Sequence, residues 1–222
     1  MDPFSYAIHL LYLFVGWIST SLNPLGGSLS TVLAVVLLTV IVRALLIPVG
    51  ISQAKAEWTR RRIAPALKKL QERYKKNPTK LQQETLALYK RENASPFAGI
   101  GPALAQAPVL AVVYGLFVRA SIDGHANALL AATLLNVPLG STLLTGGATG
   151  IAIFAVLLLV IAASALITRR SNTATGWISW LPLIAVPFAA IVPLAAALYL
   201  TVSTLWTLAE RAILRRIYWR AA

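Results

Sequence analysis

Long apolar stretches separated by short polar ones dominate the chain, and this pattern predicts helices that cross a membrane. Residues 97–118 carry no charge over 22 positions, which is enough for one helical crossing. The uncharged stretch 126–168 has 43 residues, too many for one crossing, and its part at 135–150 is rich in Gly, Thr and Pro, which indicates a loop. Another 39 uncharged residues, 171–209, are divided by prolines and predict two shorter crossings.

Composition supports the same class, because soluble proteins contain only about 45–50% apolar residues. This chain is 58% hydrophobic, with a mean hydropathy of +0.72 and only 12% charged residues. We therefore expect an all-α polytopic membrane protein. The absence of cysteine excludes disulfides, thiolate metal sites and a cysteine nucleophile. The N-terminus lacks the basic start of a signal peptide, so we expect it to be retained.

The positions of the charges, rather than the net charge of +13, predict the orientation in the membrane. Residues 53–96 hold 12 Lys or Arg and 4 Glu, and the tail 210–222 holds four Arg and one Glu. The stretch 120–147 has no Lys or Arg, although Arg119 precedes it as a mild exception. By the positive-inside rule, the two basic segments and the loop at 169–176 lie in the cytoplasm, and 120–147 lies outside.

These patterns divide the chain into ten expected segments. In chain order they are an apolar N-terminal segment and linker (1–28), a first span (29–52), a cytoplasmic helical hairpin (53–96), a second span (97–119), an outer loop (120–148), a third span (149–168), a cytoplasmic loop (169–176), a fourth span (177–191), a fifth span (193–209) and a basic cytoplasmic tail (210–222). The apolar part of the first segment, residues 4–22, either spans the membrane or lies in its outer interface.

The polar segment 53–96 has the periodicity of two amphipathic helices. Its apolar positions form two stripes at spacings of four and three residues: Ile63, Leu67, Leu70 and Tyr74, then Leu81, Thr85 and Leu88. Asn77 and Pro78 suit the N-cap and the first position of the second helix, so we expect an antiparallel hairpin. Its outer face is basic and includes Arg60, Arg61, Arg62, Lys68, Lys69 and Arg73. This face either only enforces the topology or also docks an anionic lipid, a ribosome or a translocation partner.

Motifs for catalysis are missing from the sequence. It has no HExxH, GxSxG or phosphate-binding Gly-Lys motif, and His9 and His125 are far apart. We therefore expect no enzyme activity, no cofactor and no metal. No acidic residue lies in the middle of an expected span, which disfavours an ion-coupled transporter.

Arg43 is the one charge in the apolar stretch 29–51 and is the main candidate for function. It lies about nine residues, or roughly 14 Å at the helical rise, from the cytoplasmic end of a continuous span. Insertion scales put the cost of an arginine in mid-helix at about 2.5–3.5 kcal/mol. Its side chain either snorkels to the cytoplasmic headgroups or lines a water-filled cavity open to the cytoplasm. Because arginine keeps its proton in proteins, it would be a fixed positive charge that attracts a carboxylate.

Other polar residues at the depth of the spans are candidates to line the same cavity. Thr39 lies one turn before Arg43 and shares its helical face. The remaining candidates are Gln106 in the second span, Ser164 in the third, and Tyr199, Thr201, Ser203 and Thr204 in the last. Each signal alone is weak, because Ser and Thr in such helices more often bond to their own helix backbone.

Three stretches of the sequence resemble the YidC-type membrane protein insertases, the family of the mitochondrial oxidase-assembly and chloroplast thylakoid insertases. TVIVRALLIPV resembles the first core span of the family, arginine included. LALYKRENASPFAGIGPALAQAPVLAVVYGLF resembles the hairpin exit and second span, and WLPLIAVPFAAIVPLAAALYLTVSTLWTLAE the last two spans. The matching positions are Leu88, Tyr89, Lys90, Pro96, Gly99, Pro102, Gln106, Pro108, Tyr114, Pro182, Pro193, Leu198, Tyr199 and Ser203. The chain departs from the family pattern at Ser95, Leu200, Thr204 and Glu210.

The resemblance implies five core transmembrane helices around a polar groove that opens to the cytoplasm, with an N-terminal interfacial helix at the outer surface. It also implies that Arg43, Thr39 and Gln106 line the groove, and that Tyr199 and Ser203 lie on the path of the client. A compact bacterial form in the plasma membrane is expected, with the N-terminus outside and the C-terminus in the cytoplasm. The implied partners are client membrane proteins with short acidic outer segments, together with anionic lipids, the ribosome and the secretion channel, but no specific nucleic acid.

Two other functions remain open from the residues themselves. A small transporter or channel for an anionic solute would use Arg43 as its binding charge, although such proteins often have an inverted repeat, which this sequence lacks. A structural scaffold for a membrane complex would use the basic hairpin as its docking surface, but it gives Arg43 no role.

Overall fold

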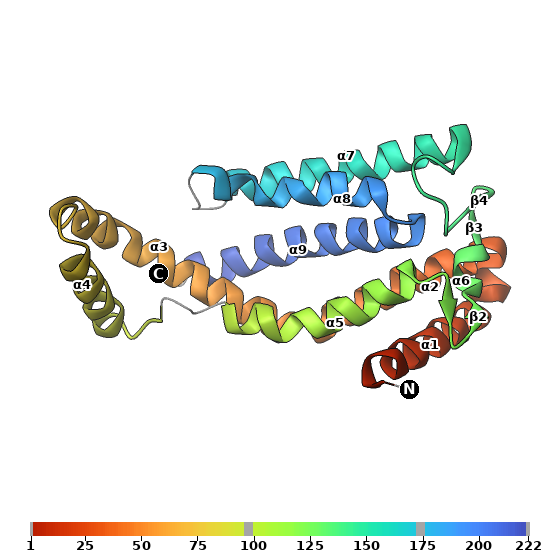
Figure 1. Cartoon of the computed structure of the whole chain (residues 1–222), viewed down its shortest axis with the longest axis horizontal. Coiled ribbons are helices and arrows are strands. Elements are labelled where there is room, and N and C mark those ends of the chain that lie inside the picture. Colours follow the sequence, from red (N-terminus) through yellow and green to blue (C-terminus); the bar gives the residue numbers. More distant parts are fainter. Residues whose placement is uncertain (1, 96–99, 172–175, 221–222) are drawn as a thin grey trace. The chain divides into compact units, whose positions relative to one another are not determined.

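The computed structural model describes residues 2–95, 100–171 and 176–220, and these are almost entirely helical (Figure 1). The chain divides into two compact units. The first contains residues 1–45 and 108–209, and the second contains residues 46–107 and 210–222. Pro96, Gly99 and positions 172–175 of the expected cytoplasmic loop lie outside the described residues.

The secondary structure follows the apolar stretches of the sequence. The elements are α1 (Pro3–Gly26), η1 (Gly27–Leu29), α2 (Ser30–Leu45), α3 (Ile47–Arg73), α4 (Pro78–Arg91), α5 (Ile100–Val118), β1 (Ser121–Ile122), β2 (His125–Ala126), α6 (Ala128–Ala131), β3 (Thr133–Leu134), β4 (Val137–Pro138), α7 (Gly147–Ser171), η2 (Gly176–Ile184), α8 (Ala185–Ile191) and α9 (Leu194–Arg220). Among the described residues, two stretches are long and apolar enough to cross a membrane, Pro3–Leu45 and Gly147–Arg170. Shorter apolar helices occupy Gln106–Val118 and Ser179–Ile191.

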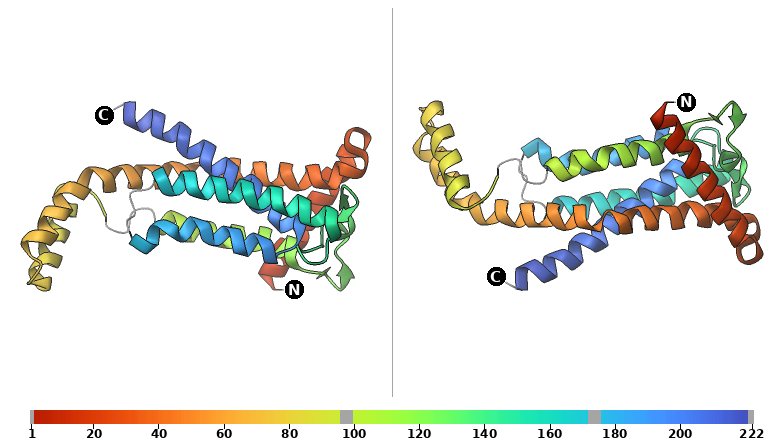
Figure 2. Two further views of the ribbon diagram at one scale, coloured as in Figure 1. Left: turned by 90° about the horizontal axis from the view of Figure 1, so that it is seen from above. Right: turned by 90° about the horizontal axis from the view of Figure 1, so that it is seen from below.

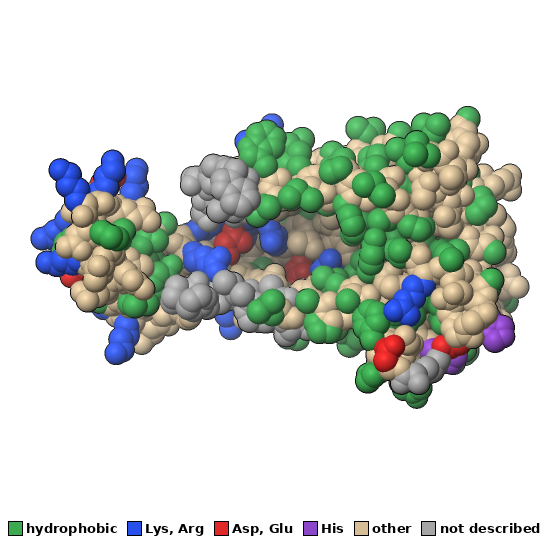
Figure 3. Space-filling model, viewed as in Figure 1, with side chains coloured by type: hydrophobic (Ala, Val, Ile, Leu, Met, Phe, Trp, Pro, Cys, Tyr) green, Lys and Arg blue, Asp and Glu red, His purple; other side chains and the backbone are tan. Residues whose placement is uncertain are grey.

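The core of the first unit is formed by side chains of α2, α5, α7 and α9. Its largest fully buried members include Leu38, Leu116, Phe117, Phe154 and Ile161. Tyr114 on α5 stacks on Phe188 on α8, with 5.6 Å between ring centroids. Hydrophobic side chains also cover the outer surface of these helices (Figure 3). An apolar exterior is what lipid favours, and helices in lipid associate through close packing rather than through the hydrophobic effect.

The N-terminal end of α9 is held by the stretch that was expected to be the outer loop. The backbone N–H groups of Leu194 and Ala195 donate to the carbonyls of Ser141 and Leu139, at 2.8 and 2.9 Å. These bonds satisfy donors that the first turn of a helix leaves without partners. The stretch also contains two short antiparallel hairpins, β1–β2 and β3–β4, each with a register of two residue pairs. The fold is therefore all-α apart from these hairpins in the described residues.

Helix α1 runs obliquely to α2 (Figures 1 and 2) and is anchored at both ends. Near its C-terminal end, Ser19 hydrogen-bonds to Thr31 of α2 at 2.9 Å. Near its other end, the imidazole of His9 forms an ion pair with Asp123, and the guanidinium of Arg119 lies 5.4 Å from the ring centroid of Phe4. The segment 4–22 is thus part of a single helix packed on the rest of the first unit.

The N-terminus of α1 is capped by a carboxylate. The backbone N–H of Ser5 donates to Oδ1 of Asp2 at 2.7 Å, as expected for an aspartate at the N-cap. This bond, helped by the Ser5 hydroxyl, holds the pKa of Asp2 below its usual value.

The expected first span, 29–52, is not one continuous helix. Helix α2 ends at Leu45 and α3 begins at Ile47, with a break at Leu46. Pro48 explains the break, because it has no N–H to donate to the carbonyl four residues earlier, and its ring clashes with that carbonyl. Proline is instead favoured in the first turn of a helix, where it lies in α3. Arg43 is consequently in the last turn of α2 rather than in the middle of a longer helix.

The second unit contains the predicted helical hairpin. The side chain of Asn77 accepts a hydrogen bond from the backbone N–H of Lys80 at 3.0 Å, which confirms the predicted N-cap of α4. Arg62 on α3 pairs with Glu92 after α4 at 3.1 Å, so the chain folds back on itself. Ile63 and Leu88, one from each predicted stripe, are buried. Lysine and arginine side chains project outward from this hairpin (Figure 3).

Two further boundaries differ from expectation. The expected fourth span, 177–191, is a 3-10 helix, η2, followed by α8, and Pro182 lies within the 3-10 part. The expected tail, 210–222, does not separate from the fifth span, since α9 continues to Arg220. No proline or glycine follows Ala209 in the sequence, so nothing local ends the helix there.

Replacement of Asn127 by alanine should destabilise the first unit. The buried Asn127 amide donates to the carbonyls of Leu116 and Arg119, at 2.8 and 3.0 Å, and its oxygen accepts from the backbone N–H of Leu129. Leaving such buried groups without partners costs about 1–3 kcal/mol. We expect a lower thermal midpoint of the purified protein in detergent, whereas Asn23→Ala, at an exposed helical position, should change it little. Equal midpoints for the two variants would contradict this role.

Candidate functional site

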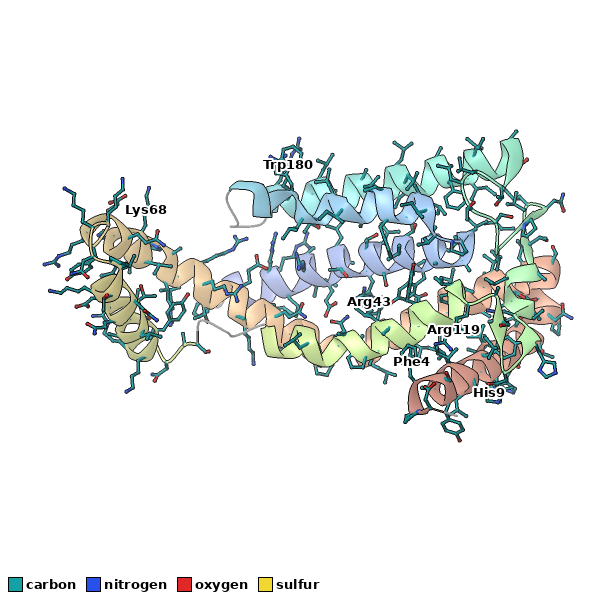
Figure 4. All side chains as sticks on the ribbon, in the orientation of Figure 1. Phe4, His9, Arg43, Lys68, Arg119 and Trp180 are labelled. Carbon is teal, nitrogen blue, oxygen red and sulfur yellow. The ribbon has the colours of Figure 1, made fainter. Side chains whose placement is uncertain are left out.

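Arg43 and the last core helix meet through a direct hydrogen bond. The guanidinium Nε of Arg43 donates to Oγ of Ser203 at 2.9 Å, although the two residues are 160 positions apart. Figure 4 shows the Arg43 side chain extending from α2 toward α9. Both residues belong to the first unit. The structure thus brings together two of the residues that the sequence singled out.

The charge of Arg43 is only partly satisfied. Its side chain is half-buried, and within the described residues no carboxylate forms an ion pair with it. Ser203 is a neutral partner and occupies only one of the five N–H donors of the guanidinium. The C-terminal end of α2, two residues away, adds favourable negative potential. The arrangement holds a cation in place while leaving donors for an anionic group.

Polar groups line one face of α9 next to this contact. Tyr199, Ser203 and Trp206 are spaced by four and three residues, which places them on one side of the helix. Ser203 and Tyr199 are 2% and 3% exposed, so they lie within the first unit rather than on its surface. The Tyr199 hydroxyl and the Trp206 indole N–H are buried without a hydrogen-bond partner in the described part of the chain. Buried polar atoms of this kind are rare unless a ligand or water serves them.

Trp206 was not among the residues selected from the sequence. Its signal was available, because it continues the spacing of Tyr199 and Ser203 along α9.

The other expected groove residues have different surroundings. Thr39 is fully buried, and its hydroxyl donates to the carbonyl of Val35 at 2.7 Å, within its own helix. Thr201 does the same with Ala197 at 2.8 Å. Gln106 is half-buried in α5 and belongs to the second unit. The structure thus does not bring Thr39 into a polar contact with Arg43 in the described residues.

The basic residues of the hairpin are not equivalent. Arg61 pairs with Glu57 at 2.8 Å, and Arg62 pairs with Glu92 while its guanidinium lies 4.9 Å from the Trp58 ring centroid. Arg73 lies against the ring of Tyr74. Exposed side chains are found at Arg60, Arg62, Lys68, Lys69 and Arg73. Several of the arginines therefore have structural contacts, whereas Lys68 projects from the hairpin (Figure 4).

The described residues contain no group of three or more His, Cys, Asp or Glu side chains that could hold a metal ion. His9 is engaged with Asp123, and the His125 ring lies 3.0 Å from the Asp123 carbonyl. The chemistry that the site offers is therefore that of a fixed cation, hydroxyl groups and an indole N–H.

Several curated proteins that are similar to this chain are named membrane protein insertases. The membrane protein insertase YidC of Clostridium perfringens is 34% identical over 117 residues, which cover 53% of this chain and 49% of the relative. The membrane protein insertase MisCA of Bacillus subtilis is 29% identical over 192 residues, 82% of this chain and 69% of the relative. A YidC of Helicobacter pylori is 38% identical over 87 residues, 39% of this chain and 16% of the relative.

These matches differ in extent. The chain spans about half the length of two clostridial relatives, 49% of the Clostridium perfringens protein and 47% of the YidC of Clostridium tetani. The sequence profile of the family described as "60Kd inner membrane protein" matches residues 22–220, which include α2, α9 and the Arg43–Ser203 contact. With nearly its whole length matched, this helical membrane protein belongs to the 60Kd inner membrane protein family, that of the YidC-type insertases.

Proposed function

We propose that this protein inserts client membrane proteins into the lipid bilayer through a polar groove that contains Arg43. The observation that carries the proposal is the half-buried guanidinium, bonded to Ser203 and without a carboxylate among the described residues. The names of the similar proteins agree with insertion and not with transport of a small anionic solute.

The physical task of an insertase is to move a polar segment across an apolar layer of about 30 Å. A wet groove that reaches part of the way shortens the dry distance. Arg43 would hold an acidic residue of the crossing segment by a charge-assisted hydrogen bond, which is stronger than a neutral one. Burial of the apolar client helix in lipid then provides the driving free energy, at about 25 cal/mol per Å² of apolar surface. The contact must be transient, because a tight ion pair would trap the client.

The proposed groove is built by five core spans. They would be α2, α5, α7, η2 with α8, and α9 up to Ala209. The polar face of α9 that carries Tyr199, Ser203 and Trp206 would form one wall, on the path of the client. Thr39 and Gln106 are assigned to the groove by their positions in the sequence and by the family resemblance.

The charge distribution supports the proposed orientation. The α3–α4 hairpin and the C-terminal end of α9 carry most of the basic residues, so by the positive-inside rule they lie in the cytoplasm. The β1–β2 and β3–β4 hairpins would lie outside, with α1 in the outer interface. The aromatic residues Phe4, Tyr6, Phe14 and Trp17 are exposed on α1, as is common for a helix in the interface. The membrane would be the bacterial plasma membrane.

The basic hairpin face is proposed to meet partners in the cytoplasm. Its exposed Lys68, Lys69 and Arg73 would contact anionic lipid, the ribosome or the secretion channel. The structural ion pairs of Arg61 and Arg62 leave less of their charge available to a partner.

Removal of the charge should reduce insertion of acidic clients. In proteoliposomes, we expect Arg43→Ala to lower protease protection of a client's acidic outer segment by about tenfold, since a bond to a charged group is worth about 1.5–3 kcal/mol. Arg43→Lys should retain most of the protection, because attraction between charges does not need a guanidinium. The matched control is the same client with a neutral outer segment, which should be indifferent to Arg43.

Two results would count against the proposal. Protection that is unaffected by Arg43→Ala would leave an insertase in which Arg43 only snorkels. Protection no greater than in empty liposomes would remove the insertion activity itself.

A carboxylate supplied by the protein itself should pair with Arg43 and inhibit insertion, although the arginine is still present. Ser203→Asp places a carboxylate where the hydroxyl now accepts from Arg43 at 2.9 Å. We expect protection of an acidic client to fall about as far as with Arg43→Ala. Ser203→Asn, which has a similar shape and no charge, is the control and should retain more protection. If the two variants behave alike, the charge of Arg43 is not what the client meets.

A further inference from the structure

The second unit contains a recess between α3 and the C-terminal end of α9 that the proposed insertion step does not use. It is shallow and open to solvent. Its charged and aromatic lining consists of Glu57, Trp58, Arg61, Arg211 and Arg215. None of these residues except Arg61 was selected from the sequence.

The recess has an excess of positive charge. One oxygen of Glu57 accepts from Nη2 of Arg61 at 2.8 Å and from Nη2 of Arg215 at 3.0 Å. Three guanidinium groups thus face one carboxylate, an excess of two positive charges. Because Glu57 bridges α3 and α9, it also fixes two of the three arginines in position. Such prearranged guanidinium groups suit the planar, two-point recognition of phosphate.

Arg211 is the member of the set that no protein anion neutralises. Its side chain is half-buried, and it makes no ion pair or hydrogen bond with the described residues. The carboxylate of its neighbour Glu210 is directed to the backbone of α3 at Gly50, where it occupies the space that a Cβ would need. In a recess with two other arginines, this charge would be stabilised further by an anion from outside the chain, beyond the solvent that reaches it.

The surroundings of the recess point to a lipid as the source of that anion. Arg211 lies two residues after Ala209, where an uncharged stretch ends, which places it near the beginning of the headgroup region. Ile213 and Ile217, one turn apart on α9, are 58% and 56% exposed, which is favourable where acyl chains can cover them. Trp58 adds the residue type that prefers the boundary between lipid and water. A soluble phosphate or a nucleic acid would not need these apolar neighbours.

We propose that this recess binds the phosphate of one anionic phospholipid, such as phosphatidylglycerol. Arg211 is its main contact, Arg61 and Arg215 complete the phosphate site, and Trp58 borders the glycerol region. Basic recesses between helices at the cytoplasmic side of a membrane commonly hold such headgroups. The inference uses the orientation proposed above but not the insertion activity. A bound lipid would tie the beginning of α3 to the end of α9.

Lipid retention by the purified full chain tests the site without any client. Native mass spectrometry in detergent, with phosphatidylglycerol titrated in, should detect one tightly retained lipid on the unmodified protein. Arg211→Gln should weaken that retention about fivefold, on the basis of about 1 kcal/mol per basic residue near an anionic surface. The matched control is Arg216→Gln, which removes the same charge from an exposed position of the same helix outside the recess and should change retention by less than about twofold. Arg211→Lys should fall between them.

Three outcomes would overturn the inference. Equal losses for Arg211→Gln and Arg216→Gln would mean that lipids follow the overall charge of the helix and not a site. Equal retention of phosphatidylcholine would mean that the anionic headgroup is not recognised. Displacement of the lipid by millimolar inorganic phosphate would assign the recess to a soluble anion. Because no client is present, none of these outcomes bears on whether the protein inserts membrane proteins.

Discussion

A positive charge in an apolar surrounding needs a partner, and the bond from Arg43 to Ser203 is how the first unit meets this requirement. An unpaired arginine at membrane depth is costly, and a carboxylate partner would have cancelled its charge. Ser203 gives the guanidinium a partner and orients it. Because serine is neutral, the guanidinium stays cationic. The same bond joins α2 to α9, so the polar faces of the two helices are held in register. The aromatic contact of Tyr199 with Phe117, at 6.1 Å between ring centroids, continues that packing toward α5.

The second unit solves an opposite problem, because it must keep many like charges together. Among the described residues, Glu57 pairs with Arg61 and Arg215, and Glu92 pairs with Arg62. Such pairs are partly exposed and contribute little stability individually. Their main effect is to direct side chains, which leaves a surface of uncompensated charge in defined places. A surface of this kind is suited to anionic partners, whether lipid or macromolecule.

Local rules predicted much of this structure, and tertiary contacts decided the rest. Asn77 and Pro78 predicted the start of α4, because a helix cap depends on only a few neighbouring residues. Pro48 carries a readable signal too, because proline kinks or ends helices, and the helix breaks beside it at Leu46. The Arg43–Ser203 hydrogen bond joins distant parts of the chain and follows from no local pattern. The sequence indicated only that both residues lie at the depth of the spans and are candidates to line one cavity. The carboxylate bridge at Glu57 was missed because it depends on α9 extending well beyond the apolar stretch.

The shortness of α2 has a consequence for the bilayer around the protein. Its 16 residues span roughly 24 Å at 1.5 Å per residue, less than the hydrocarbon thickness of about 30 Å. A bilayer meets a short apolar element by thinning locally, at a cost of fractions of a kcal/mol per Å of mismatch. Lipid beside α2 would therefore be thinner and more deformed than elsewhere in the membrane. The protein would then act on the bilayer as well as on the client, because the apolar barrier would be narrower at the place where the client would cross it.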